Sequence, residues 1–367
     1  MDAERSDAPA VTLGSGADRR RVLRGLLGAA GAASLAGAPG RATPAAAKPA
    51  TTLFADDFRG GFDATGGDWA YFEFPGFVAD DGTETTSAAG LRVRARRFTK
   101  TVPQETGPDS LAGGLDHVKW LVFADRTTAA GLPGFAAPEG RELAVAATLS
   151  ARTFGTKHHP FGGAVEDPGR DLRLACCALN GFDVASWMVF DLLLTNERIF
   201  AVYERLPFGR GPGGLGAYAS FTFQVPVAER RPGDEHELGI AYDRSAGTVR
   251  WLVGGEERFR VDRIGRLVDR KYMTIDHGGA EEDVAPAQLG FGMGMFTLLD
   301  GRLPSGEALV RLSTAPDFYF DPAAGEPVPQ AFVDEESRRR SRLFGQGAEL
   351  RVRRYVVESR PPSGRAG

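Results

Sequence analysis

The sequence has little cysteine and no excess of positive charge. Its 367 residues include only two cysteines, the neighbours Cys176 and Cys177, so a framework of disulfides is excluded. Neighbouring side chains of a strand point to opposite faces, so two buried thiols are expected here rather than a strained vicinal disulfide. The formal net charge of −4 provides no general attraction for nucleic acid or an anionic membrane, and neither is expected as a partner.

No segment is both apolar and long enough to predict a membrane span. The run Val22–Ala38 is short and rich in glycine. It follows the basic stretch Asp18–Arg24 (DRRRVLR), which resembles the twin-arginine export motif, and it precedes an Ala-x-Ala pattern at Ala45–Ala47. We therefore expect residues 1–47 to be an export signal, cleaved before Lys48, and the protein to be extracellular or associated with the cell envelope. A disordered Ala/Arg tail is the alternative.

Long helical patterns are also lacking, and strand-like patterns replace them. Runs rich in Val, Ile, Phe and Leu are separated by Gly, Pro and Asp turns, and a short helix is expected only near Asp334–Phe344. The expected strands include 91–98, 142–153, 172–179, 185–194, 198–206, 221–227, 237–243, 249–253, 259–261, 288–298 and 349–357. Many short strands without a repeat or linker predict one all-β domain over residues 48–360, with a disordered tail at 361–367.

The stretch Met188–Gly209 (MVFDLLLTNERIFAVYERLPFG) predicts a hairpin in which each apolar strand carries one carboxylate, Asp191 or Glu204. If Asn196 and Glu197 are the two turn residues, the carboxylates are diagonal neighbours on one face, with backbones about 7–8 Å apart. A turn longer or shorter by one residue would put them on opposite faces. The hypothesis of a carboxylate pair thus depends on this register.

An isolated carboxylate in an apolar strand must face solvent, a cleft or a partner, because its burial is costly. In a ligand cleft, the pKa of one carboxyl would rise, and Asp191 and Glu204 would form an acid/base pair. Carboxyl separations of about 5–5.5 Å suit a retaining glycosidase and about 6.5–9.5 Å an inverting one. In the alternative interpretation, Asp191 accepts a buried hydrogen bond from an Arg or Tyr while Glu204 lies at the rim.

Aromatic and histidine side chains are further candidates for ligand binding. Aromatic rings stack on sugars, but a sandwich core uses the same residues, and single histidines are often structural. The candidates are Trp69, Trp120, Tyr203, His117 and His277.

Metal and cofactor binding receive no specific support from the sequence. The acidic stretches Asp317–Asp321 and Asp334–Glu336 have the oxygen ligands that Ca²⁺ prefers, but no spacing fixes their geometry. A structural Ca²⁺ remains an unsupported alternative to a solvated acidic surface, and no metal or cofactor is predicted.

Three segments at the start, middle and end of the chain resemble the concanavalin A-like superfamily, and most specifically the family-16 glycoside hydrolases. They are Thr52–Asp63 (TLFADDFRGGFD), Glu235–Phe259 (EHELGIAYDRSAGTVRWLVGGEERF) and Glu349–Glu358 (ELRVRRYVVE). A group of exported actinobacterial proteins is also similar. The resemblance implies a jelly-roll sandwich of two antiparallel sheets whose concave face binds a polysaccharide or another small-molecule ligand.

The catalytic motif of that family is not intact. Its members carry Glu-x-Asp-x-(x)-Glu on one strand, and the matching strand here is Val189–Leu194. Only Asp191 is retained, while Val189 and Leu193 or Leu194 replace the two glutamates. The hydrolytic mechanism of the family is therefore not implied.

Three functions stay open from the sequence. The first is a carbohydrate-active protein in which Asp191 and Glu204 form an acid/base pair outside the family's motif. The second is a non-catalytic module that binds a glycan or the cell envelope, which the loss of both glutamates favours. The third is an isomerase or cyclase for a non-sugar metabolite, which an unusually apolar cleft would favour.

Overall fold

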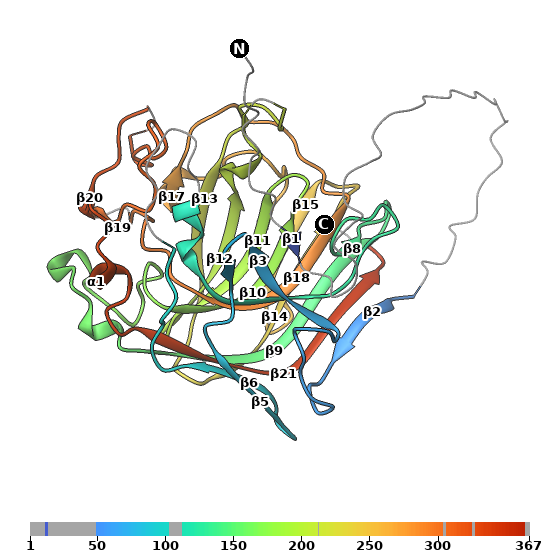
Figure 1. Ribbon diagram of the computed structural model, residues 1–367. Helices are drawn as coiled ribbons and strands as arrows, with labels where there is room; N and C mark the ends of the chain where they lie inside the picture. Colours follow the sequence, from blue (N-terminus) through green and yellow to red (C-terminus); the bar gives the residue numbers. More distant parts are fainter. Residues whose placement is uncertain are drawn as a thin grey trace, which may run out of the picture.

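The computed structural model describes residues 49–102, 112–211, 213–303, 306–324 and 327–363, together with the short strand β1 (Thr12–Leu13). Two large antiparallel sheets pack on each other as a jelly-roll sandwich, which confirms the predicted fold class (Figure 1). Apart from β1, the expected export signal lies outside the described residues, and only 361–363 of the expected tail lie within them.

The larger sheet has eleven strands. Its order is β1, β3 (Trp69–Phe74), β7 (Val118–Ala124), β18 (Gln288–Phe296), β10 (Cys176–Asp183), β11 (Met188–Leu194), β12 (Arg198–Arg205), β13 (Phe221–Glu229) and β17 (Met273–Asp276), with β4 (Phe77–Val78) paired to β3 and β8 (Phe135–Ala136) paired to β18. The strands β10, β11 and β12 lie at its centre, so the hairpin that carries both carboxylates is flanked by paired strands on each side.

The smaller sheet has eight strands. Its order is β16 (Glu256–Val261), β15 (Thr248–Val253), β14 (Glu235–Asp243), β9 (Glu142–Phe154), β21 (Gly347–Arg360), β6 (Gly90–Ala95) and β5 (Thr83–Ser87), with β2 (Thr51–Asp56) paired to β21. The first and last strands of the predicted domain, β2 and β21, are thus neighbours.

Helices are few and short among the described residues. They are α1 (Arg339–Arg342), inside the segment where a helix is predicted, and the 3₁₀ turns η1 (Ala112–His117), η2 (Thr156–His158), η3 (Gly162–Ala164), η4 (Pro207–Gly209) and η5 (Arg270–Tyr272). A small parallel pair, β19 (Ala308–Val310) and β20 (Phe332–Asp334), lies apart from the two sheets (Figure 1). No helix in the described part of the chain is long and apolar enough to cross a membrane.

The predicted strands agree with the structure where apolar and polar residues alternate, and less well elsewhere. The predicted strand 142–153 differs from β9 by one residue, whereas the strand predicted at 172–179 begins only at Cys176 and continues to Asp183. Strand β7 was not among the predictions. All seven of its residues are buried, including Lys119, so it shows no alternation by which to recognise a strand.

The eleven-stranded sheet is covered by apolar residues on both faces. Toward the other sheet, Phe190 and Leu192 of β11 join the core between the sheets. On the opposite side, which we call the outer face of the eleven-stranded sheet, Val189, Leu193 and Val202 belong to a second apolar layer.

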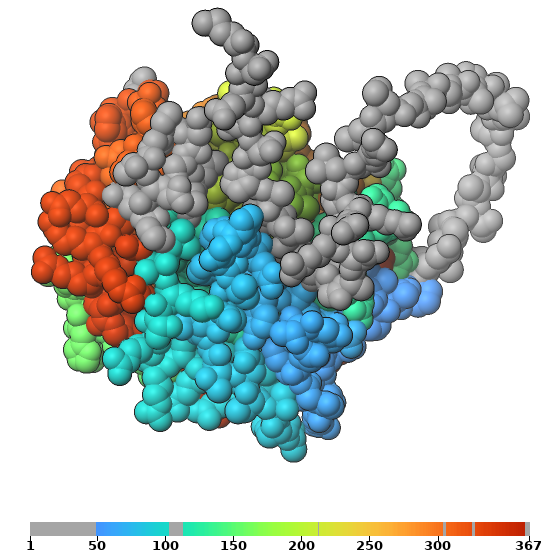
Figure 2. All heavy atoms as spheres, in the orientation of Figure 1, coloured from blue at the N-terminus to red at the C-terminus, as the bar shows by residue number. Residues whose placement is uncertain are grey.

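Segments from residues 50–150, blue to green in Figure 2, form much of the lower front of the molecule, and the orange-red residues beyond 300 form its left side.

The two cysteines confirm the expected arrangement. Cys176 lies in the apolar layer of the outer face and Cys177 lies in the core between the sheets. Both are free and buried.

Glycines in β18 allow its neighbour to approach closely. A Cβ atom added at Gly292 would lie 2.3 Å from the carbonyl oxygen of Val122 and 2.9 Å from Cδ1 of Phe123. Real Cβ contacts are never this short, so the absence of a side chain serves packing against β7.

Candidate functional site

Strands β11 and β12 pair in the register on which the predicted carboxylate pair depends. Asp191 lies opposite Val202, and Glu204 lies opposite Val189. Phe190 and Leu192 beside Asp191, and Tyr203 beside Glu204, belong to the core, so both carboxylates point to the outer face of the eleven-stranded sheet. They are diagonal neighbours with backbones about 7–8 Å apart.

Asp191 is almost enclosed, with 7% of its surface exposed. The side-chain amide of Asn180 donates to its Oδ2 at 2.8 Å, and the backbone N–H of Gly181 donates to its Oδ1 at 3.1 Å. The alternative interpretation expected such a buried hydrogen bond, but its donors are an amide and a backbone N–H rather than an Arg or Tyr. Burial raises the pKa of Asp191 well above its ordinary value, and the negative charge of Glu204 raises it further. Asp191 thus keeps its proton to higher pH than an exposed aspartate.

Glu204 is partly buried and has more polar surroundings. The hydroxyl of Thr222, on the neighbouring strand β13, donates to its Oε1 at 2.6 Å. Burial raises the pKa of Glu204, but the Thr222 hydrogen bond and the nearby His117 offset part of that increase. The two carboxyls therefore differ in environment, and Glu204 is the one better suited to hold a negative charge.

His117 and Asp300 form an ion pair beside Glu204. Nε2 of His117 lies 2.6 Å from Oδ1 of Asp300, and the Tyr319 hydroxyl donates to Oδ2 at 2.7 Å. Burial lowers the pKa of His117, but Asp300 and Glu204 outweigh it and the net shift is upward. Burial raises the pKa of Asp300, but His117 and Tyr319 outweigh it and the net shift is downward. Both shifts favour the charged pair.

His277 follows β17 and packs against the segment that carries Phe318 and Tyr319. Its Nδ1 is hydrogen-bonded to the carbonyl oxygen of Phe318, and its ring centroid lies 4.3 Å from that of Phe318 and 5.5 Å from that of Tyr319. Burial lowers the pKa of His277 to about 4, so the ring is neutral near pH 7. Its enclosed position is that of a structural histidine that supports the loop carrying Tyr319.

Two buried polar atoms on the outer face lack partners. The register aligns Asn180, Asp191, Val202 and Gln224 across four adjacent strands. Oδ1 of Asn180 and Nε2 of Gln224 are buried without a hydrogen-bond partner among the described residues. Leaving such a group unpaired costs about 1–3 kcal/mol. One acceptor and one donor, both enclosed by protein atoms, are thus left unpaired on either side of the carboxylates.

Three predicted ligand-binding residues lie elsewhere. Trp69, Trp120 and Tyr203 are 1%, 0% and 0% exposed and belong to the core between the sheets. Their polar atoms are satisfied there; the indole N–H of Trp120, for example, donates to Glu84 at 2.6 Å. The core interpretation is therefore correct for these three, because a side chain between the sheets cannot reach a ligand on an outer face.

The part of the chain that the structure describes holds no group of three or more His, Cys, Asp or Glu side chains arranged to bind a metal ion. In the acidic stretches considered for Ca²⁺, Asp321 pairs with Arg302 at 3.2 Å and Asp334 pairs with Arg338 at 3.1 Å. Arginine thus neutralises these carboxylates.

Residues 55–361 match the family model described as "Family of unknown function (DUF6081)". The chain belongs to this family. It is also 28% identical over 384 residues to "Uncharacterized protein L829" of Acanthamoeba polyphaga mimivirus, covering 79% of this chain and 84% of the relative.

Solved structures with a similar arrangement of strands include three enzymes. The catalytic domain of an endo-1,3-beta-glucanase (laminarinase) from Thermotoga petrophila RKU-1 has 12% identity and a TM-score of 0.40, with coverage of 85% of this chain and 99% of that one. The Crh5 transglycosylase in complex with NAG has 11% identity and a TM-score of 0.39, with coverage of 85% and 86%. The family 7 alginate lyase A1-II' has 10% identity and a TM-score of 0.37, with coverage of 77% and 83%. Similarity at this level does not transfer an activity.

Several members of the site were missed at the sequence level. Asn180 and Gln224 are polar residues in apolar strands, which is the same signal that identified Asp191. This signal could have identified them as well. Asp300 and Tyr319 come from segments without regular pattern, and no local signal connects them with His117.

Chemically, the arrangement supplies a carboxyl whose pKa is raised strongly, a second carboxyl whose raised pKa is partly offset by Thr222 and His117, and a histidine beside it whose pKa is also raised. Two carboxyls whose pKa values are separated by different environments can act as the acid and the base of general acid–base catalysis. The apolar layer around them, with Val189 and Leu193, limits access of water and strengthens their mutual influence.

Proposed function

We propose that the protein is an exported carbohydrate-active protein that holds its ligand on the outer face of the eleven-stranded sheet. In this proposal Asp191 is the general acid and Glu204 the general base. The observation that carries the proposal is the placement of these two carboxyls on one face, both with raised pKa values, between the unpaired polar atoms of Asn180 and Gln224.

For a glycosidic bond, the proton would move from Asp191 to the leaving oxygen as the bond to the anomeric carbon breaks. Glu204 would accept a proton from the attacking water, and the carboxyls would return to their starting states by exchange with solvent. The positive charge of His117, which Asp300 stabilises, would favour the ionised form of Glu204 at the start of the cycle.

The apolar surroundings favour a second candidate. Val189, Leu193, Phe200 and Val202 surround the carboxyls on the outer face, a setting suited to a ligand less polar than a sugar. Proton transfer by the same acid/base pair would then isomerise or cyclise a non-sugar metabolite. A non-catalytic glycan-binding module is a third outcome, consistent with Val189 and Leu193 at the motif positions of the glutamates.

The test is incubation of the protein with β-glucans, galactans and bacterial envelope glycans, with cleavage products and thermal shift measured in parallel. Asp191→Asn and Glu204→Gln are compared with Glu237→Gln, an exposed glutamate on the other sheet. Cleavage lost in the first two variants and retained in the third supports the proposal. A thermal shift without cleavage identifies a binding module, and no response to any glycan directs the search to non-sugar metabolites.

Export is tested separately. Expression of the chain with and without residues 1–47 in a host with a twin-arginine pathway, followed by N-terminal sequencing of the secreted protein, should give a mature chain that begins near Lys48. Retention of the intact chain in the cytoplasm would contradict the export signal.

A further inference from the structure

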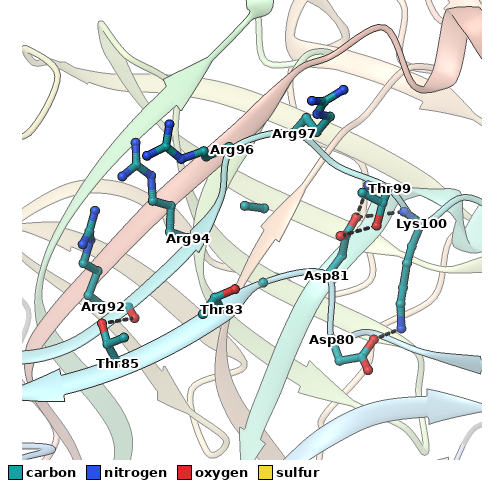
Figure 3. Close-up of a pocket in the computed structure, with 12 residues that line it drawn as sticks. Asp80, Asp81, Thr83, Thr85, Arg92, Arg94, Arg96, Arg97, Thr99 and Lys100 are labelled. Atoms are coloured by element: carbon teal, nitrogen blue, oxygen red, sulfur yellow. Dashed lines mark hydrogen bonds and ion pairs between the residues drawn. The ribbon is translucent and has the colours of Figure 1, made fainter.

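A basic cavity lies on the other side of the molecule, at the edge of the eight-stranded sheet. It has a volume of about 580 Å³ and is lined by β5, β6 and the segment that follows β6. Its cationic lining residues are Arg92, Arg94, Arg96, Arg97 and Lys100. Figure 3 shows the side chains of Arg92 and Arg94 of β6, and of Arg96 directly after it, extending to the same side of the chain.

The strand pattern explains why the arginines gather on one face. Leu91, Val93 and Ala95 alternate with them and point into the core. The arginines therefore project from the outer face of the eight-stranded sheet, opposite to the core. A run of alternating apolar and basic residues thus produces a row of positive charges at the surface.

The acidic residues of the cavity are already satisfied. Asp80 pairs with Lys100. Asp81 accepts hydrogen bonds from the backbone N–H of Lys100 at 2.9 Å and from the hydroxyl of Thr99 at 2.8 Å (Figure 3). These carboxylates are thus engaged locally and do not neutralise the arginines of β6.

Glu349 of β21 neutralises only part of the row. Its Oε2 lies 2.7 Å from Nη2 of Arg92 and 3.4 Å from Nε of Arg94, while its Oε1 lies 2.9 Å from Nη2 of Arg351. One carboxylate is therefore shared by three guanidinium groups. Nε of Arg94 is buried and has no hydrogen-bond partner among the described residues.

Arg96 and Arg97 are exposed, and neither forms an ion pair within the described part of the chain. Both residues line the same cavity as Arg94. A second cavity of about 310 Å³ adjoins this row on β21 and β9, where Arg152 is exposed and likewise makes no ion pair with a described residue. Positive charge without a partner thus extends over both cavities.

The two cavities are continuous in the strand register. Arg94 lies opposite Glu349, which lies opposite Arg152, so one line crosses β6, β21 and β9. With Thr83 on β5, opposite Arg94, the line crosses four strands and spans about 14 Å at the usual strand spacing. A site of this length suits an extended ligand with several negative charges.

We propose that this surface binds an acidic polysaccharide, a polyuronate, through its carboxylates. Guanidinium groups match planar carboxylates in a bidentate geometry. A uronate chain carries one carboxylate per sugar with hydroxyls between, which suits free arginines interspersed with Thr83, Thr85 and Ser150. Nucleic acid carries a charge about every 1.7 Å, so some of its phosphates would also meet the carboxylates of the site.

This binding site is independent of the outer face of the eleven-stranded sheet. The core between the sheets separates it from Asp191 and Glu204. Binding here therefore does not require the proposed acid/base pair, and the two proposals stand or fall separately. A glycan held on this surface would keep an exported protein attached to an acidic matrix.

The test is fluorescence anisotropy of a labelled oligogalacturonate with the full chain at low salt. Its fully methyl-esterified form serves as the neutral counterpart, and polyphosphate serves as competitor. The double variant Arg96→Gln/Arg97→Gln is compared with Arg258→Gln/Arg263→Gln, which makes the same charge change at exposed arginines elsewhere. Thermal unfolding of both variants checks that they are folded.

We expect binding of the acidic form, no binding of the ester, and a dissociation constant at least about tenfold higher for the first double variant, corresponding to roughly 0.7 kcal/mol per guanidinium. The control variant and Asp191→Asn should bind like the wild-type protein. No binding at low salt, or equal affinity of both double variants, would overturn the site. Stronger competition by polyphosphate than by oligogalacturonate would overturn the choice of polyuronate.

Discussion

Replacement of Asp300 by asparagine removes the negative charge that pairs with His117. Asp300 is 2% exposed, and the ion pair with His117 has a separation of 2.6 Å. Breaking a buried pair costs about 3–5 kcal/mol, and the lower end applies because the His117 side chain is 16% exposed. We therefore expect Asp300→Asn to lower the free energy of unfolding by about 3 kcal/mol, which for about 300 residues lowers Tm by about 5 °C.

The loss should depend on pH in a defined window. The pKa of His117 is raised from 6.5, so its contribution to stability is complete below that value and is lost as the pH rises through the higher pKa of the folded state. The pKa of Asp300 is lowered from 3.8, so its contribution is complete above that value and is lost as the pH falls. The effect of the substitution should be largest between pH 3.8 and 6.5.

Urea unfolding of the wild-type protein and of Asp300→Asn across this range measures the difference. As the pH rises above 6.5 and His117 loses its proton, the difference should shrink toward about 1.5 kcal/mol, the lower end for a hydrogen bond to a charged group, because Asp300 stays ionised. Asp262→Asn, which removes an exposed carboxylate 3.6 Å from Arg260, is the control and should change little. A difference that does not vary with pH would refute the charged His117–Asp300 pair.

Four further outcomes are expected. Asp191→Asn should stabilise the protein relative to wild type by an amount that grows as the pH rises above 3.8, and that reaches about 1.4 kcal/mol for each unit by which folding raises the pKa of Asp191. The reason is that ionisation of Asp191 favours the unfolded state. A pH-independent difference in urea unfolding would contradict this. Lys119→Met should cost about 3 kcal/mol in the same assay, the lower end for breaking a buried pair, because it removes the cation 3.3 Å from the buried Asp116 but leaves Arg342 at 3.8 Å. Gly292→Ala should cost about 1–3 kcal/mol because of its contact with β7, and a neutral effect would show that β7 moves freely. Native Cys177 should resist a thiol reagent near neutral pH and react only after unfolding, since burial raises its pKa to about 12.

Much of the candidate site could be predicted from local pattern. The alternation of side chains in a strand, with the two-residue turn, placed Asp191 and Glu204 on one face, and the structure has the same register. The same alternation placed Cys176 and Cys177 on opposite faces. These are properties of neighbours in the chain, and strand geometry is sufficient to derive them.

Other members of the site depend on contacts between distant segments. Asp300 and Tyr319 reach His117 through segments without regular pattern, about 180 and 200 residues further along the chain, where no periodicity applies. The assignment of Trp69 and Trp120 failed for a related reason. Aromatic residues serve a core and a ligand cleft equally well, and only the packing of the two sheets decided that both lie in the core.

The sequence by itself determined the all-β class and the alternation of arginines in β6, because both follow from the two-residue period of a strand. It determined the hairpin register only on the condition of a two-residue turn, which the structure has. Only the tertiary structure decided which faces are covered. Periodicity shows that residues share a face, but whether that face meets another sheet, a loop or solvent depends on how remote segments pack. That packing buried Asp191 and partly buried Glu204, and it left Arg96 and Arg97 exposed over a cavity.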